Sequence, residues 1–233
     1  MSLSHLEQQG TYTQMLFVDY SSAFNTILPL KLGCVLSPLL YTLYTSDYTS
    51  AHPSNTIIKF ADVTTVVGLI SGGDESAYRA KVEQLTGWCR DNNLLLNTAK
   101  TKELFIDFQR TKTDIPPLHI NGECVEKVED FCYLGVHLEK DLNWTVNTSE
   151  LLKKAQQRLH FLKVLRKNNI PLRLLVSFYR CTMESILACC LCVWSTSCTV
   201  AQRTSLQRII NTAKNLTDCP LLTLEELHHS RCL

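Results

Sequence analysis

The sequence lacks the features that mark secreted and membrane-spanning proteins. Its first ten residues contain no basic start followed by an apolar run, so we expect no secretory signal. The most apolar stretch, Leu174–Trp194, is interrupted by Arg180 and Glu184, and only Ile186–Trp194 is uninterrupted. A membrane-spanning helix needs roughly 20 apolar residues. We therefore predict an intracellular protein, nuclear or cytoplasmic, in which this stretch is a buried helix without a transmembrane segment.

Acidic residues are missing from residues 151–180, although the net charge of the whole chain is only +1. A basic segment of this kind is a candidate surface for the phosphates of nucleic acid. The alternative is a solvated charged face with no ligand. The basic residues of the segment are Lys153, Lys154, Arg158, Lys163, Arg166, Lys167, Arg173 and Arg180.

Cysteine, by contrast, is abundant, with 11 residues in the chain. Without a secretory signal we expect these cysteines to be reduced thiols. Four of them cluster in sequence but lack the paired C-x₂₋₄-C spacing of structural zinc sites, so we favour buried thiols on an apolar helix over a metal site. They are Cys189, Cys190, Cys192 and Cys198.

Apolar patterning predicts a strand, a helix, a hairpin, a second helix and a third strand segment in the first half of the chain. This order is the split βαβ, or ferredoxin-like, arrangement, in which the second hairpin strand lies beside the first strand. Asp19 ends the first strand and Asp62 lies at the hairpin tip, so we expect them at one sheet edge although they are 43 positions apart. The segments are Met15–Val18, a helix beginning at Ser37, the hairpin Ile57–Phe60 and Val63–Ile70, a helix between Gly73 and Asn92, and Glu103–Phe108.

The second half of the chain changes from strands to helices. Leu118–Val128 predicts a hairpin around Asn121-Gly122, and helices follow from about Asn147, one of them from Pro171 to about Trp194. The fold class is therefore α+β, with an antiparallel sheet covered by helices on one face and followed by an all-α region. We place an irregular segment at 1–14, the sheet domain at 15–146 and the helical region at 147–233.

Two carboxylates at one sheet edge form the donor set that Mg²⁺ prefers, since this ion is often held by one or two carboxylates and substrate phosphates. Two such ions clamp the attacking and leaving oxygens in phosphoryl transfer. The alternative is that Asp19 and Asp62 only end strands and cap turns.

Five segments, in this order, resemble motifs of the reverse transcriptases of LINE-type (non-LTR) retrotransposons. Four resemble motifs of the polymerase palm, the fifth resembles the primer-grip hairpin, and the basic helical remainder resembles the thumb. The segments are MLFVDYSSAFNTI (15–27), GCVLSPLLYTLYTSD (33–47), FADVTTVV (60–67), NNLLLNTAKTKELFIDF (92–108) and FCYLGVHL (131–138).

The resemblance implies a function and a set of residue roles. The family copies an RNA template from a DNA primer, with Asp19 and Asp62 holding catalytic Mg²⁺. Phe24 and Gly33 would line the nucleotide pocket, and either Lys100 or Lys102 would lie near the incoming triphosphate. The primer backbone would contact Tyr133, Leu134 and Gly135, and the duplex phosphates would contact Lys153, Lys154, Arg158, Lys163, Arg166 and Lys167.

Three departures from the family pattern predict an impaired polymerase. Val63 replaces the second Asp of the F-A-D-D motif. Only 13 residues lie between Asp19 and Gly33, where the family has a longer segment, and Leu32 replaces a Gln. Almost nothing precedes the first motif, so we expect the fingers and the endonuclease to be absent. We predict a degenerate, truncated reverse transcriptase or, as the alternative, a non-catalytic nucleic-acid-binding remnant; the sequence does not predict an oligomeric state.

A second resemblance covers the region around 118–194, which is similar to the N-terminal part of AlkB-type tRNA-modifying oxygenases with a methyltransferase. An Fe(II) oxygenase site needs two His and one carboxylate, commonly beginning with H-x-D. None of the seven His residues has Asp two positions later, and only His137 comes close, with Glu139. The sequence also lacks a G-x-G loop for a methyl-donor cofactor. We therefore do not predict this chemistry.

Overall fold

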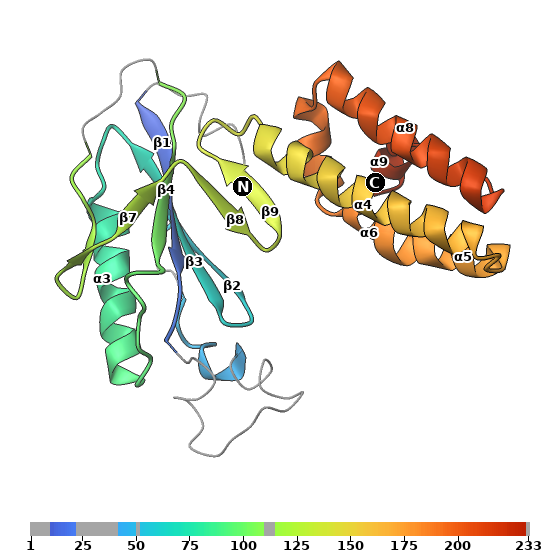
Figure 1. Ribbon diagram of the computed structural model, residues 1–233. Coiled ribbons are helices and arrows are strands. Elements are labelled where there is room, and N and C mark those ends of the chain that lie inside the picture. The colour runs from blue at the N-terminus through green and yellow to red at the C-terminus, as the bar shows by residue number, and fades with distance from the viewer. Residues whose placement is uncertain (1–9, 22–41, 50–51, 110–114, 232–233) are drawn as a thin grey trace. The chain divides into compact units, whose positions relative to one another are not determined.

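A computed structural model describes residues 10–21, 42–49, 52–109 and 115–231, which divide between two compact units, 1–131 and 132–233 (Figure 1). The first unit is built on a five-stranded sheet of order β2-β3-β1-β4-β7. This order places β3 beside β1, as the sequence predicted. The strands are β1 (Thr11–Val18), β2 (Asn55–Phe60), β3 (Val63–Ser71), β4 (Lys102–Ile106) and β7 (Glu126–Val128).

Strand β1 is the centre of this sheet. It pairs antiparallel with β3 on one edge and with β4 on the other, and all eight of its residues are buried. Because both edges are paired, the strand extends further than its apolar core, Met15–Val18. The prediction of an irregular segment to residue 14 was therefore wrong for residues 11–14, while residues 1–9 lie outside the described part.

The sheet is mixed, which corrects the expected antiparallel sheet. The Asn121-Gly122 turn forms a short hairpin between β5 (His119–Ile120) and β6 (Glu123–Cys124), with both turn residues at positive φ. The chain then leaves this hairpin, and β7 pairs parallel with β4. Side-chain pattern alone could not reveal this, because a free strand edge accepts either direction.

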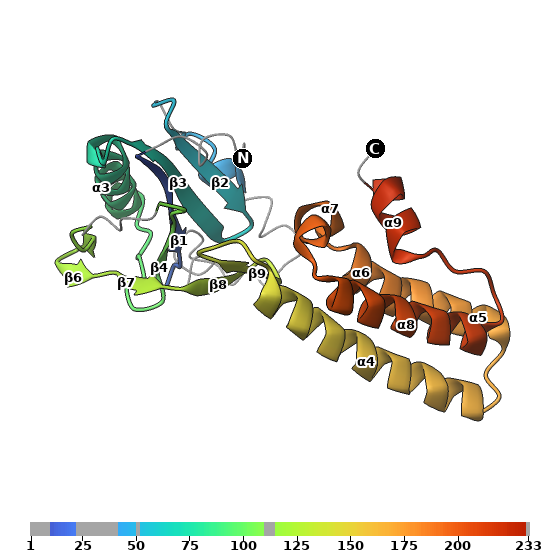
Figure 2. The same ribbon diagram turned by 90° about the horizontal axis from the view of Figure 1, so that it is seen from above.

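Helix α3 (Ser76–Asp91) packs against one face of the sheet (Figure 2). It buries Val82 and Leu85 against β1 and β3, and the Tyr78 ring lies directly over Gly68 of β3. The start of the other predicted helix, from Ser37, lies outside the described residues. This face forms the core of the first unit.

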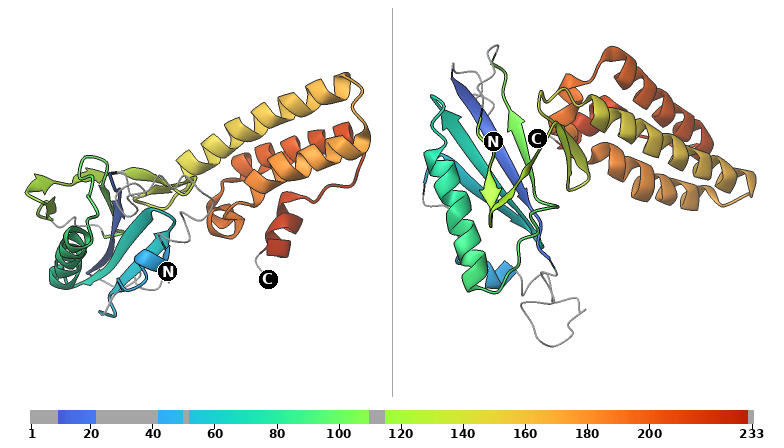
Figure 3. Two further views of the ribbon diagram at one scale, coloured as in Figure 1. Left: turned by 90° about the horizontal axis from the view of Figure 1, so that it is seen from below. Right: turned by 60° about the vertical axis from the view of Figure 1, so that its left-hand side comes forward.

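A two-stranded hairpin, β8 (Asp130–Tyr133) and β9 (Val136–Glu139), leads into the second unit, which contains a bundle of helices (Figure 3). The two units divide within β8, after Phe131. The predicted boundary at 146/147 was therefore too late, because Val136 and Leu138 pack on the helical core. The helices are α4 (Thr145–Lys167), α5 (Leu172–Phe178), α6 (Ser185–Ala188), α7 (Leu191–Trp194), α8 (Val200–Thr217) and α9 (Leu224–Arg231).

The predicted continuous helix from Pro171 to Trp194 is broken. A π-helical turn, Tyr179–Glu184, follows α5, and the helix ends at Cys189, after which Cys190 adopts a left-handed conformation with φ of 50°. The break turns Cys189, Cys190 and Cys192 towards solvent, so the prediction of buried thiols was wrong there. The prediction of reduced thiols also fails at Cys192, which is disulfide-bonded.

Within the described chain, no single helix is long and apolar enough to cross a membrane. The segments Leu172–Ala188 and Leu191–Ser197 meet that criterion only when taken together, across a bend of 43°.

Candidate active site and nucleic-acid interface

The strand register brings Asp19 and Asp62 to the same end of the sheet, where β1 ends and where the turn between β2 and β3 lies. Val18, the last residue of β1, pairs with Thr64 of β3, and Asp19 follows it directly. On the other side, Phe60 pairs with Val63, so Ala61 and Asp62 form the two-residue turn that joins β2 to β3. Asp19 is half-buried and Asp62 is exposed. The antiparallel pairing therefore produces the juxtaposition that the strand order predicted.

Val63 lies next to this pair of carboxylates. The paired register of β1 and β3 ends at Val18 and Thr64, so Asp19 directly follows one of these residues and Val63 directly precedes the other. Val63 is also the first residue of β3 after the turn that holds Asp62. An apolar side chain therefore follows Asp62 directly, at the position where a carboxylate would have added negative charge.

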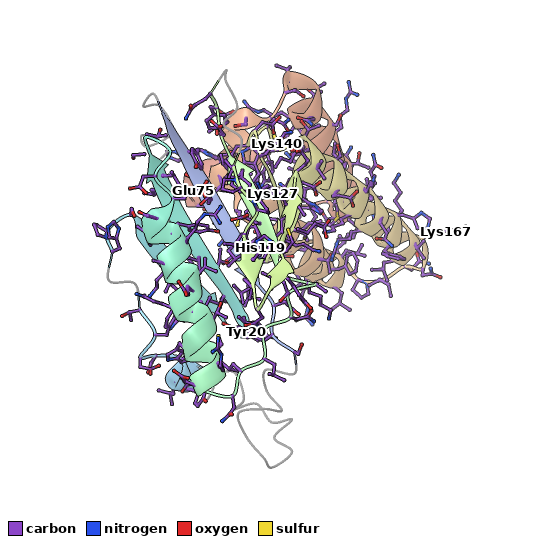
Figure 4. All side chains as sticks on the ribbon, turned by 90° about the vertical axis from the view of Figure 1, so that its left-hand side faces the viewer. Tyr20, Glu75, His119, Lys127, Lys140 and Lys167 are labelled. Atoms are coloured by element: carbon purple, nitrogen blue, oxygen red, sulfur yellow. The ribbon has the colours of Figure 1, made fainter. Side chains whose placement is uncertain are left out.

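The loop before β4 holds the backbone of Asp19. The carbonyl of Asp19 accepts a hydrogen bond from the backbone N–H of Asn97 at 2.9 Å, and the N–H of Asp19 donates to Oγ1 of Thr101 at 3.3 Å. Tyr20, labelled in Figure 4, continues this contact through a bridge to Leu96. No sequence pattern singles out Asn97 or Thr101, although both lie within the segment 92–108 that resembles a family motif.

The structure distinguishes the two candidate lysines. Nζ of Lys102 donates to Oε2 of Glu126 at 2.5 Å and to the carbonyl of Ala99 at 2.9 Å. Lys100 is exposed, and its side chain has no ion pair among the described residues. Lys100 therefore has a free ammonium group, whereas a phosphate would have to compete with Glu126 for Lys102.

The residues near Asp19 and Asp62 supply only part of a magnesium site. The described residues contain no group of three His, Cys, Asp or Glu side chains that could hold a metal ion. Asp19 and Asp62 supply two carboxylates, and one or two carboxylates with substrate phosphates are a common donor set for Mg²⁺. The chemistry of these donors therefore fits a site that substrate completes. Phe24 and Gly33, the other predicted nucleotide-binding residues, lie outside the described residues.

The predicted primer-grip residues form the turn between β8 and β9. Leu134 and Gly135 both have positive φ, of 49° and 86°, and the Leu134 side chain is 47% exposed. Tyr133 is the last residue of β8. A leucine in the left-handed region is strained, and such strain is often found at binding sites. A cavity of about 90 Å³ begins beside Gly135 and is also lined by Lys154 of α4.

The basic helix is α4, whose apolar stripe of Leu151, Ala155, Leu159 and Leu162 is buried in the bundle. Lys153 pairs with Glu150 at 2.7 Å, and Lys167 lies at the C-terminal end of α4 (Figure 4). The remaining predicted cations of α4 have no ion pair within the described chain, so they are available to an external anion: Lys154, Arg158, Lys163, Arg166 and Lys167.

Comparison with known proteins finds distant relatives for most of the chain. In an alignment 204 positions long, which covers 81% of this chain, it is 26% identical to a "Probable RNA-directed DNA polymerase from transposon BS" of Drosophila melanogaster. Over 190 residues it is 24% identical to an "RNA-directed DNA polymerase from mobile element jockey" of Drosophila funebris. This chain carries a reverse-transcriptase-like region. It spans about a fifth of the length of these relatives, 22% and 20%.

A second match is shorter than this reverse-transcriptase-like region. The family described as "Alkylated DNA repair protein alkB homolog 8, N-terminal" matches residues 144–185. That segment comprises α4, α5 and the π-helical turn. It carries the basic surface, but among its described residues no cluster of His and carboxylates forms a metal site.

Proposed function

We propose that this chain carries a degenerate RNA-directed DNA polymerase region, with a palm-like first unit and a thumb-like second unit. The observation that supports the proposal is the strand register: Asp19 directly follows Val18, the last β1 residue paired with β3, and Asp62 lies in the turn that leads into β3. In this proposal the two carboxylates would hold Mg²⁺, which would stabilise charge on the transferring phosphoryl group. Lys100 would contact the triphosphate, and the turn at Leu134-Gly135 would contact the primer.

Polymerase activity is weak or lost in this proposal. Val63 leaves the positive charge of the ions less compensated, and phosphoryl transfer depends almost entirely on positioning and charge stabilisation. A displacement of about 1 Å in such a site can cost about 100-fold in rate. The sequence that separates Asp19 from Gly33 is also shorter than in the family, so the nucleotide pocket would lack part of its wall.

Primer extension on an RNA template, with Mg²⁺ or Mn²⁺, tests the catalytic half of the proposal. We expect no extension by the natural chain, and detectable extension after Val63→Asp only if the short segment before Gly33 still forms a pocket. Val63→Asn is the matched control, because the Asn side chain has nearly the same shape as Asp but carries no charge. Extension by the natural chain, abolished by Asp19→Asn, would contradict the proposed inactivity.

Nucleic-acid binding without catalysis is the second candidate function, favoured by the unpaired cations of α4. Binding through phosphates predicts that log K falls linearly with log salt, with a slope of about −0.7 per phosphate contact for single strands. Each cation removed from α4 should reduce this slope by about that amount. Affinity that does not change with salt would exclude α4 as a phosphate-binding surface.

A further inference from the structure

The outer surface of α4 carries an exposed aromatic pair. Phe161 is 49% exposed, because successive helical residues are rotated by about 100° and this places it off the stripe that contains Leu159 and Leu162. The His160 ring lies 6.1 Å from the Phe161 ring, at an interplanar angle of 60°. Both side chains are exposed, and the Phe161 ring keeps part of its surface open to solvent.

Two cations precede this aromatic pair on the same helix. Arg158 and Lys154 precede Phe161 by three and seven residues, which are the spacings that place side chains on one face. They lie about 4.5 Å and about 10 Å from Phe161 along the helix axis. Neither forms an ion pair within the described chain. Single exposed apolar residues are common on surfaces, but an aromatic ring in line with two free cations has a specific chemistry.

We propose that α4 binds single-stranded nucleic acid, with Phe161 stacking on an unpaired base while Arg158 and Lys154 contact phosphates. Base stacking on aromatic side chains, combined with a basic track, is the general mode of single-strand binding. Bases within a duplex are already stacked on both faces, so a side chain that projects from a helix surface reaches only unpaired bases. This inference rests on the nucleic-acid binding proposed above and specifies the strand type.

Fluorescence anisotropy with the full chain tests the inference, using a labelled single-stranded RNA and the same RNA annealed to its complement. Phe161→Leu keeps the apolar character and removes the π face, so it should weaken single-strand binding by about 5- to 150-fold. It should leave duplex binding and the salt slope unchanged. Phe161→Trp should preserve single-strand affinity.

Val164→Ala is the matched control, because Val164 lies one turn further along α4 and is 43% exposed without being aromatic. It should bind both RNAs as the natural chain does, while Arg158→Ala should reduce the salt slope. Circular dichroism of each variant verifies that α4 is intact. If the natural chain binds neither RNA, the proposed nucleic-acid binding fails and this inference fails with it.

Two other results would overturn only the stacking inference. In the first, the natural chain binds RNA but Phe161→Leu binds single strands equally well. In the second, Phe161→Leu and Val164→Ala weaken RNA binding equally. Phosphatidylserine vesicles would also compete with RNA, and each of the two substitutions would weaken that competition. This result would identify an apolar membrane-contacting surface instead.

Discussion

The hydroxyl of Tyr78, on α3, donates a hydrogen bond of 3.0 Å to Oε1 of Glu103 on β4. Both side chains are buried, and Oε2 of Glu103 has no hydrogen-bond partner in the described part of the chain. Burial raises the pKa of Glu103 to about 7, although the Tyr78 hydrogen bond and the charge of Lys127 act in the opposite direction. The sheet of the first unit therefore contains a carboxyl group whose burial favours the protonated form.

This raised pKa predicts a stability that falls as pH rises. Below the unfolded pKa of about 4.5, Glu103 is protonated in both states and its contribution is fully present. As the pH rises towards about 7, the unfolded state ionises first, and roughly 3 kcal/mol of stability is lost. Urea unfolding at several pH values measures this loss. Glu103→Gln keeps an acceptor for Tyr78 and should remove most of the decline between pH 4.5 and 7.

Glu123→Gln is the control for this experiment, because Glu123 is exposed on β6. Its pH profile should match that of the natural chain. If Glu103→Gln and the natural chain lose stability equally over this range, Glu103 does not titrate as the structure indicates.

Any side chain at position 68 should clash with Tyr78 of α3, which packs on Gly68. A Cβ at this position would lie 2.5 Å from Cδ2 of Tyr78, which is shorter than any van der Waals contact. Gly68→Ala should therefore destabilise the first unit by about 1–3 kcal/mol, as overpacked cores do, measured as a lower urea midpoint. A Cβ on Gly87, within α3, would have no heavy atom within 4 Å, so Gly87→Ala should stabilise the protein by about 0.5–1 kcal/mol. Equal effects of the two substitutions would show that Tyr78 can move.

Val63→Asp should create a stronger site for divalent metal at the end of β1. A third carboxylate, at the position after Asp62, adds negative charge where Mn²⁺ or Mg²⁺ would bind, and a ligand that binds only the folded state raises the melting temperature. We expect Mn²⁺ to raise the melting temperature of Val63→Asp more than that of the natural chain, with Val63→Asn resembling the latter. Equal shifts in all three proteins would mean that position 63 does not face the metal.

Replacing Leu134 at the β8–β9 turn should increase stability and weaken binding to a primer. Left-handed backbone costs a non-glycine residue about 1–2 kcal/mol, and Asn tolerates this conformation better than Leu. Leu134→Asn should therefore raise the unfolding free energy by about 0.5–1 kcal/mol. If the turn contacts a primer, the same substitution should weaken binding of a primer–template duplex. A stability gain with unchanged duplex affinity would remove Leu134 from the proposed contact.

Local patterns in the sequence determined much of the first unit. Apolar runs of strand length, the break at Ala61-Asp62 and the Asn121-Gly122 dipeptide depend on backbone preferences within a few residues. Those preferences were sufficient for the order β2-β3-β1-β4 and for the common edge of Asp19 and Asp62. The basic segment of α4 could likewise be identified from composition and helical period.

Only the tertiary structure decided the contacts that join distant segments. The parallel pairing of β7 with β4 depends on which sheet edge remains free. It places Glu126 beside Lys102, so that of the two candidate lysines only Lys100 has no ion pair among the described residues. The helix break at Cys190 could not be predicted from the helical spacing of apolar residues, because that spacing does not describe how the helices of the bundle pack. The sequence by itself determined periods and turns, because these depend on neighbouring residues, whereas edge pairing and exposure depend on the whole fold.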